Sequence, residues 1–262
     1  MKHVLVALLV SCNFICGAQN SGFDMKKVEK TLVKLNDSLH ASKFEVSNQD
    51  YTAFLQSLLR ENRSDEHQTA DIVANGWADE LSYNEPYVKH YHTHDAYSGY
   101  PVVNISYEGA ILFCDWMTEQ YNAHPKKEYT KVRFRLPTEE EWTMAAKGGN
   151  PDAVYPWKGT QLQNSKGEIM ANFRSGQGDE MGIAGDLKSN ADVTAPVESY
   201  QPNGYGLYNM AGNVAEMTAE KGLAKGGSWR DPDKALQIDS DGNYERPSAF
   251  VGFRYFMEVI EE

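Results

Sequence analysis

The residue types best suited to holding a metal ion occur in one glycine-containing stretch, Asn203 to Glu216. Hard cations such as Ca²⁺ take oxygen ligands from carboxylates, side-chain amides and backbone carbonyls. A tight turn through Gly212 would gather oxygens from residues at offsets 0, +3, +5 and +7, which are Asn209, Gly212, Val214 and Glu216. From this spacing alone, a glycine-bearing turn with a solvated Glu216 carboxylate is the simpler interpretation.

A second group with metal-binding chemistry is the run His90-Tyr-His-Thr-His94. On a strand, His90, His92 and His94 would share one face and could hold Zn²⁺ or another transition ion. The alternative is an exposed polar loop, which we favour because no general base or activated nucleophile is evident beside the run. A divergent metal-dependent enzyme that uses these histidines is the main rival hypothesis for function.

Carboxylates are also concentrated in a late acidic loop, which contains Asp231, Asp233, Asp239, Asp241 and Glu245. Such a loop could bind a cation, a sugar or a basic protein surface, and it could equally serve only to keep the protein soluble. The whole chain carries a formal net charge of −12, which repels nucleic acid and anionic lipid. No glycine-rich phosphate motif is present, so we expect no nucleic-acid partner.

The first 18 residues are predicted to be an export signal. Lys2 precedes the apolar run 4–10, and small residues lead to the polar Gln19. The sequence Leu9-Val-Ser-Cys12 also resembles a lipobox, so a lipid anchor at Cys12 is the alternative to cleavage after Ala18. We predict an exported protein in the periplasm or associated with the outer membrane. No later apolar run approaches the roughly 20 residues that a transmembrane span needs.

The remaining chain must position these groups within one folded domain. We predict an N-terminal extension over residues 19–39 and a single domain over residues 40–262, because no linker or repeat divides that segment. Helices are expected to begin at Asn48, Ser106 and Thr138, the last with a capping box to Glu141. Short strands are predicted over 101–105, 225–229 and 252–258, and residues 64–94 and 155–203 are predicted to be irregular. The fold class is therefore α+β with long loops.

Five sequence blocks resemble those of one family, in the same order. They are 44–54, 100–116, 135–149, 155–157 and the late block that runs from Asn203 to Arg254. Together they resemble the formylglycine-generating enzymes, also called sulfatase-modifying factors, whose loop-rich fold is distantly similar to C-type lectins. A narrower resemblance, to lipoproteins of gliding motility and type IX secretion, rests on the segments His90–His92, Ile169–Gly178 and Asn213–Glu216.

The resemblance implies structural Ca²⁺ at Asn209, Gly212, Val214 and Glu216, because the family has a calcium site at the same offsets. It also implies the first half of a second calcium site, at Asn172 and Phe173. A later loop differs in length, so Asp186 and Asp192 compete for the rest of that site, and the position that aligns without gaps is Ser189.

The same resemblance places two copper-binding cysteines where this chain has Asp231 and Leu236. The enzymes oxidise a substrate cysteine to formylglycine, and soft thiolates suit that task because they select Cu(I). Cys12 and Cys16 lie in the predicted signal, and Cys114 is expected to be a core residue. We therefore predict no enzyme activity but a pseudoenzyme of the cell envelope. It would act as a binding or scaffold component with an envelope protein partner, in a gliding-motility or type IX secretion assembly. A carbohydrate-binding module is the third hypothesis.

Overall fold

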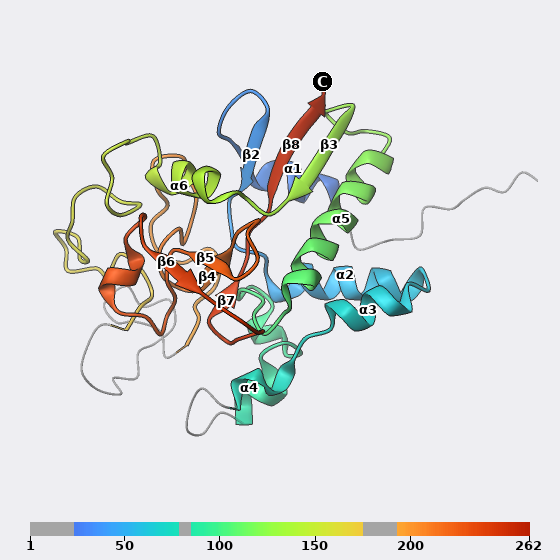
Figure 1. Cartoon of the computed structure of the whole chain (residues 1–262), viewed down its shortest axis with the longest axis horizontal. Coiled ribbons are helices and arrows are strands. Elements are labelled where there is room, and N and C mark those ends of the chain that lie inside the picture. The colour runs from blue at the N-terminus through green and yellow to red at the C-terminus, as the bar shows by residue number, and fades with distance from the viewer. Residues whose placement is uncertain (1–23, 79–84, 175–192) are drawn as a thin grey trace, which may run out of the picture.

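The computed structural model describes residues 24–78, 85–174 and 193–262. The predicted export signal, with Cys12 and Cys16, lies outside these residues. In the described part of the chain, short helices and two small sheets are connected by long loops (Figure 1). This architecture confirms the predicted α+β, loop-rich fold class.

The first sheet is antiparallel and brings the two ends of the described chain together. Its strand order is β1-β2-β8-β3, and its members are β1 (Leu32–Lys34), β2 (Leu39–Ser42), β3 (Lys131–Arg135) and β8 (Phe256–Glu261). Helix α1 (Met25–Thr31) precedes β1, and its Met25 and Val28 are buried in the main core. The predicted extension 19–39 therefore contributes to both the sheet and the core.

The second sheet carries the predicted metal-binding turn. Its strand order is β6-β5-β4-β7, and its members are β4 (Ala215–Met217), β5 (Leu223–Lys225), β6 (Asp241–Asn243) and β7 (Val251–Gly252). The strand predicted over 225–229 is misplaced, because Gly226 and Gly227 have positive φ angles and end β5. The strand predicted over 252–258 is in fact two strands, one in each sheet.

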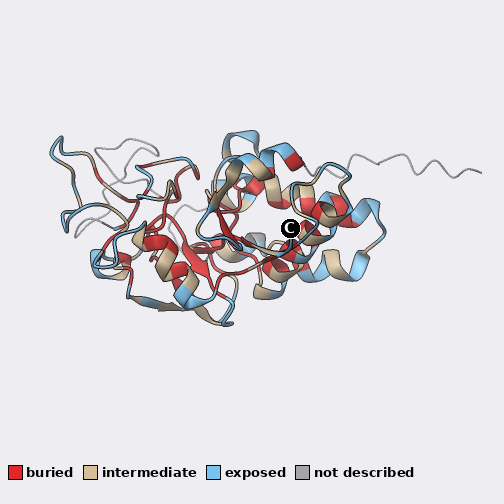
Figure 2. Cartoon of the chain, turned by 90° about the horizontal axis from the view of Figure 1, so that it is seen from above, coloured by how far each residue is buried: buried red, intermediate tan, exposed pale blue. Residues whose placement is uncertain are grey.

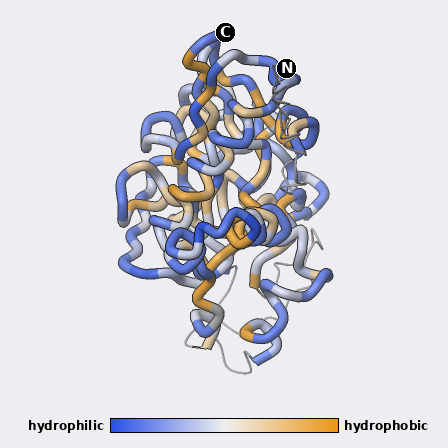
Figure 3. The backbone as a smooth tube through the Cα atoms, turned by 90° about the vertical axis from the view of Figure 1, so that its right-hand side faces the viewer, coloured by the Kyte–Doolittle hydropathy of each residue, from blue (hydrophilic) through white to orange (hydrophobic). Residues whose placement is uncertain are grey.

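Two helices bury their aromatic side chains in the main core, to which the first sheet also contributes residues. They are α2 (Asn48–Arg60) and α5 (Tyr107–Ala123), with α3 (Ser64–Ala70) packed beside them. Tyr51, Phe54 and Phe113 form contacting ring pairs in this core. Figure 2 shows buried residues on the inner strands and inner helix faces, and Figure 3 shows hydrophilic residues along the outer loops.

The helix caps follow the sequence signals closely. The predicted capping box of α6 (Glu139–Lys147) is confirmed, since Thr138 and Glu141 exchange side-chain and backbone hydrogen bonds. Ser106 caps α5 as predicted. The cap of α2 is Ser47 rather than Asn48, because the Asn48 amide instead points inward and donates to the carbonyls of Tyr91 and Tyr97.

The segment predicted to be irregular over residues 64–94 is largely helical where it is described. It contains α3, η1 (Ala74–Trp77) and α4 (Glu85–His90), and η2 (Asp95–Tyr97) follows. Trp77 and Tyr91 are fully buried against Trp229 and its neighbours, so aromatic packing holds these short helices on the domain. The predicted β segment over 101–105 is reduced to one isolated bridge, between Ser47 and Pro101.

Candidate metal centre

The predicted calcium-binding turn is a sharp reversal that leads into β4. Asn209, Gly212 and Asn213 have φ angles of 51°, 73° and 65°, all in the left-handed region. A Cβ atom at position 212 would lie 2.3 Å from the carbonyl oxygen of Asn172. Only glycine fits there, because both the positive φ and the close backbone approach exclude a side chain.

Glu216 is a buried, fully engaged carboxylate, so the interpretation of a solvated Glu216 is wrong. Its relative exposure is 1%. Oε2 accepts hydrogen bonds from Trp142 Nε1 and Arg254 Nε, both at 2.7 Å, while Oε1 accepts from Arg254 Nη2 at 2.5 Å. A carboxylate can be buried here because the bidentate guanidinium and the indole N–H satisfy it.

Arg254 joins three parts of the chain through its remaining donors. It is completely buried. Its Nη1 donates to the carbonyls of Ser42 and Lys43, and its Nη2 donates to the carbonyl of Tyr208. The guanidinium therefore fixes the chain after β2 against the residues before the metal-binding turn.

Glu45 is a second buried carboxylate beside the turn, and sequence analysis missed its role. Its relative exposure is 2%. Its oxygens accept from Asn209 Nδ2 at 2.8 Å and from Asn213 Nδ2 at 3.0 and 3.1 Å. The available signal was a charged residue flanked by apolar ones in Phe44-Glu45-Val46.

We call Glu45, Asn209, Asn213, Glu216 and Arg254 the buried polar cluster. It contains two carboxylates and one guanidinium, so acidic groups outnumber basic ones. Burial and then the Glu216 carboxylate raise the pKa of Glu45 to about 8, against the opposing effects of Arg254 and the two amides. The Glu45 carboxyl is therefore mostly protonated at neutral pH, and a bound cation would lower its pKa and favour the ionised form.

The first half of the predicted second calcium site adjoins this cluster. Asn172 is fully buried, and its side-chain amide donates to the Val193 carbonyl at 2.7 Å and to Asn213 Oδ1 at 3.3 Å. Phe173 is buried in a neighbouring apolar cluster. Asp186, Asp192 and Ser189 lie outside the described residues, so the second half of this site stays a prediction.

The chemistry of the first predicted set fits a hard cation. Among the described residues, no three His, Cys, Asp or Glu side chains gather around one point, so the ligands would have to include amide and backbone oxygens. Asn209, Gly212, Val214 and Glu216 would supply that mixture from one turn. A bound Ca²⁺ would share the Glu216 carboxylate with Arg254. Its positive charge would favour the ionised form of the nearby Glu45 carboxyl, whose pKa is otherwise raised.

The two positions that correspond to the copper-binding cysteines have structural roles. Asp231 Oδ2 accepts from the Ser228 backbone N–H at 2.9 Å and from Ser228 Oγ at 2.6 Å, which closes the turn after β5. Leu236 is the last residue of η3 (Asp233–Leu236), and its side chain is fully buried. Cys114 is buried in α5 as predicted, and this burial strongly raises the pKa of its thiol.

The predicted histidine face does not form. His90 ends α4, and residues 91–94 form a turn rather than a strand. His90 and His94 are exposed, whereas His92 turns inward and its Nδ1 lies 3.0 Å from Asn48 Oδ1. Burial lowers the pKa of His92 to about 4. The histidines therefore do not converge on a common metal position.

The acidic loop is not uniformly solvated either. Asp241 forms an ion pair of 2.6 Å with Lys225, whose side chain is 1% exposed. Asp231 closes the turn described above, while Asp233, Asp239 and Glu245 are exposed, as is Asp241 itself. Two of the five acidic residues are thus structural.

The short helices, two small sheets and central buried turn define a sulfatase-modifying-factor-like domain. The family model described as "Sulfatase-modifying factor enzyme 1-like domain" matches residues 11–259, so the chain belongs to this family. The crystal structure of CarF superposes with a TM-score of 0.54 at 22% identity, covering 88% of this chain and 93% of that chain. At this identity the likeness shows the fold.

Two curated relatives indicate the range of proteins within the family. Formylglycine-generating enzyme of Mus musculus is 35% identical over 123 residues, which are 47% of this chain and 28% of that protein. Inactive C-alpha-formylglycine-generating enzyme 2 of Bos taurus is 34% identical over 142 residues, which are 50% of this chain and 39% of that protein. The matches therefore span less than half of each relative, and the family contains both enzymes and proteins named inactive.

Proposed function

We propose that this protein is a non-catalytic member of the family that binds a protein partner in the bacterial cell envelope. The observation that carries the proposal is the chemistry at the copper positions, where a turn-closing Asp231 and a buried Leu236 replace thiolates. Cys114, the one cysteine among the described residues, is sealed in the core and cannot supply a copper-binding pair. The fold is retained, while the groups needed for the family's oxidation are not.

The envelope location rests on the predicted export signal, and the type of assembly rests on the resemblance to gliding-motility and type IX secretion lipoproteins. Among the described residues, no helix combines the length and the apolar character needed to cross a bilayer. We favour this role over the alternative metal-dependent enzyme, because His92 contacts Asn48 rather than joining His90 and His94 at one point. The exposed loops are the part of the surface that is specific to this chain, and we propose that they form the protein interface.

The exposed carboxylates Asp233 and Glu245 are the part of this interface that we propose to test. In a pull-down from envelope membranes, the D233N/E245Q variant should retain less partner. Its association rate should fall and become less salt-dependent, because peripheral charges act mainly on the encounter step. Its unfolding free energy should change by no more than about 0.5 kcal/mol, as is usual for surface substitutions.

The matched control for this experiment is the pair E198Q/E220Q, which removes two exposed carboxylates elsewhere. Retention of every partner by D233N/E245Q, with unchanged kinetics, would remove the acidic loop from the interface. A wild-type protein that captures no envelope protein above background would argue against the binding role itself.

We further propose that Ca²⁺ stabilises the domain through Asn209, Gly212, Val214 and Glu216. A ligand that binds only the folded state adds about 2.7 kcal/mol at a hundredfold excess over its dissociation constant. Calcium should therefore raise the melting temperature of the wild-type protein, and chelator should reverse the shift. N209A should lose most of this calcium-dependent shift, whereas N243A, at an exposed asparagine of β6, should keep it. An equal response to calcium in both variants would contradict the assignment.

A further inference from the structure

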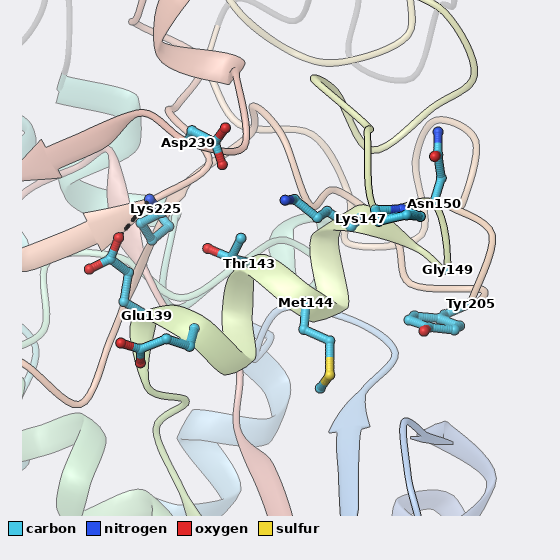
Figure 4. A pocket seen from close by; sticks show the side chains of 11 residues that line it. Glu139, Thr143, Met144, Lys147, Gly149, Asn150, Tyr205, Lys225 and Asp239 are labelled. Carbon is cyan, nitrogen blue, oxygen red and sulfur yellow. Dashed lines mark hydrogen bonds and ion pairs between the residues drawn. The ribbon is translucent and has the colours of Figure 1, made fainter.

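A cavity on the outer side of α6 has no role in the metal centre and shares only Asp239 with the acidic loop of the proposed interface. It lies between α6, the turn that follows α6, strand β5 and the segment after η3 that contains Asp239 (Figure 4). Its volume is about 560 Å³. This is within the range of roughly 300–1,000 Å³ that small-molecule sites occupy. Its polar lining consists mainly of Glu139, Glu140, Thr143, Lys147, Lys225 and Asp239.

Two charged groups of this cavity, Lys225 and Glu139, are joined to each other by an ion pair. Lys225 comes from β5 with its ammonium 2.6 Å from Asp241 and 3.4 Å from Glu139. Glu139 and Thr143 project from the first two turns of α6. Figure 4 shows the side chains of Lys147, Thr143 and Asp239 directed toward the same space. Donors and acceptors therefore face one another across the cavity.

An apolar surface completes the wall on the side of the α6 C-terminus. A Cβ atom added to Gly149 would lie 3.5 Å from a ring carbon of Tyr205, so the tyrosine ring packs over this turn. Met144 and Pro151 line the cavity beside it. The ring is partly exposed, so it offers an apolar face together with a phenolic hydroxyl.

The mixture of charges restricts what the cavity can bind. An anion would meet the carboxylates of Glu139, Glu140 and Asp239, and a cation would meet the ammonium groups of Lys147 and Lys225. A purely apolar ligand would remove both kinds of charge from water without replacing their hydrogen bonds. A neutral polyhydroxylated ligand avoids these costs, because each hydroxyl can donate to a carboxylate and accept from an ammonium group.

We propose that this cavity binds a neutral oligosaccharide segment of a glycan. Hydroxyl groups of the sugar would donate to Asp239 and Glu140 and accept from Lys147. The apolar C–H face of a neighbouring sugar unit would pack on Tyr205, which Figure 4 shows at the opposite end of the cavity from Asp239. This inference goes beyond the proposed partner-binding function and does not depend on it. It also does not depend on a cation, because none of the predicted calcium ligands lines the cavity.

The test is a binding titration of the full chain with three sets of soluble oligosaccharides: neutral hexose oligomers, uronate-containing oligomers and amino-sugar oligomers. We expect saturable binding of at least one neutral oligomer, and at least tenfold weaker binding of the charged sets. D239A and Y205A should each weaken the neutral interaction at least tenfold, which is the scale expected for losing a hydrogen bond to a charged group or a stacked ring. D233A, at an exposed aspartate outside the cavity, is the matched control.

Tyr205 also packs on buried residues. The binding result for Y205A is therefore used only if its melting temperature stays close to that of the wild type. Asp239 is exposed, so D239A should not perturb the fold. Equal weakening by D233A, or preferred binding of uronate or amino-sugar oligomers, would overturn the proposal. So would the absence of binding by every neutral oligomer at millimolar concentration. Insoluble polysaccharide that retains the wild type but not D239A would identify a cell-surface polymer, rather than a free oligosaccharide, as the source of the sugar.

The result can be separated from that of the partner experiment. D233N/E245Q should still bind the sugar, and Y205A, which lies outside the acidic loop, should still capture the protein partner. Failure of sugar binding with intact partner capture rejects this inference alone.

Discussion

Replacing Arg254 by methionine should lower the free energy of unfolding by about 3–5 kcal/mol, the loss typical of breaking one side of a buried ion pair. The substitution would leave the Glu216 carboxylate, 1% exposed, with only the Trp142 N–H as a partner. It would also remove the donors to the carbonyls of Ser42, Lys43 and Tyr208. Equilibrium unfolding in urea measures the effect.

Two comparison variants keep this prediction specific. R246M changes an exposed arginine and should cost less than about 0.5 kcal/mol. R254K retains the positive charge but loses the bidentate geometry, so its stability should lie between those of R254M and the wild type. A loss below about 1 kcal/mol for R254M would contradict the account of the buried polar cluster.

Asp241 is the second position where a large effect is expected. D241N should destabilise the fold by about 2 kcal/mol, because it leaves the Lys225 ammonium with Glu139 at 3.4 Å as its remaining carboxylate. The exposure of Asp241, 52% of its side chain, keeps the loss below that of R254M because water can partly replace the carboxylate.

The matched control for D241N is D233N, which neutralises an exposed aspartate a few residues earlier. Thermal melting of both variants, measured under the same conditions, separates an ion-pair effect from a general change in charge. Equal melting temperatures for D241N and D233N would mean that Lys225 does not need Asp241. This result would restore the sequence-based expectation of a solvated acidic loop.

Local signals in the sequence predicted helices α2, α5 and α6 but not α3 and α4, and long-range contacts explain most of what was missed. The capping box at Thr138 depends on residues three apart, so it is readable from sequence. Glu45 reaches Asn209 across 164 positions in the chain, and no local pattern reports such a contact. The same limit applies to Asp241, whose partner Lys225 lies on the neighbouring strand.

The rival hypothesis of a histidine metal site, which we do not favour, is not supported for a related reason. Alternation at positions 90, 92 and 94 indicates a shared face only if the segment is a strand. Burial of Trp77 and Tyr91 instead folds this region into short helices and a turn, which points His92 toward Asn48. In contrast, the Asn209–Glu216 turn could be located from sequence because its glycine is required by backbone geometry. Arg254, the ion-pair partner of Glu216 in that turn, could not be assigned from the sequence.

The most direct test of the central claim is an assay for formylglycine formation. The purified full chain is incubated with Cu(I), oxygen and a sulfatase-derived peptide that contains the substrate cysteine, and aldehyde is measured by mass spectrometry. An active member of the family serves as the positive control, and a boiled sample gives the background. With Asp231 and Leu236 in place of thiolates, we expect no aldehyde above the boiled sample while the positive control turns over. Enzymatic turnover by the wild-type chain would contradict the assignment of a non-catalytic protein.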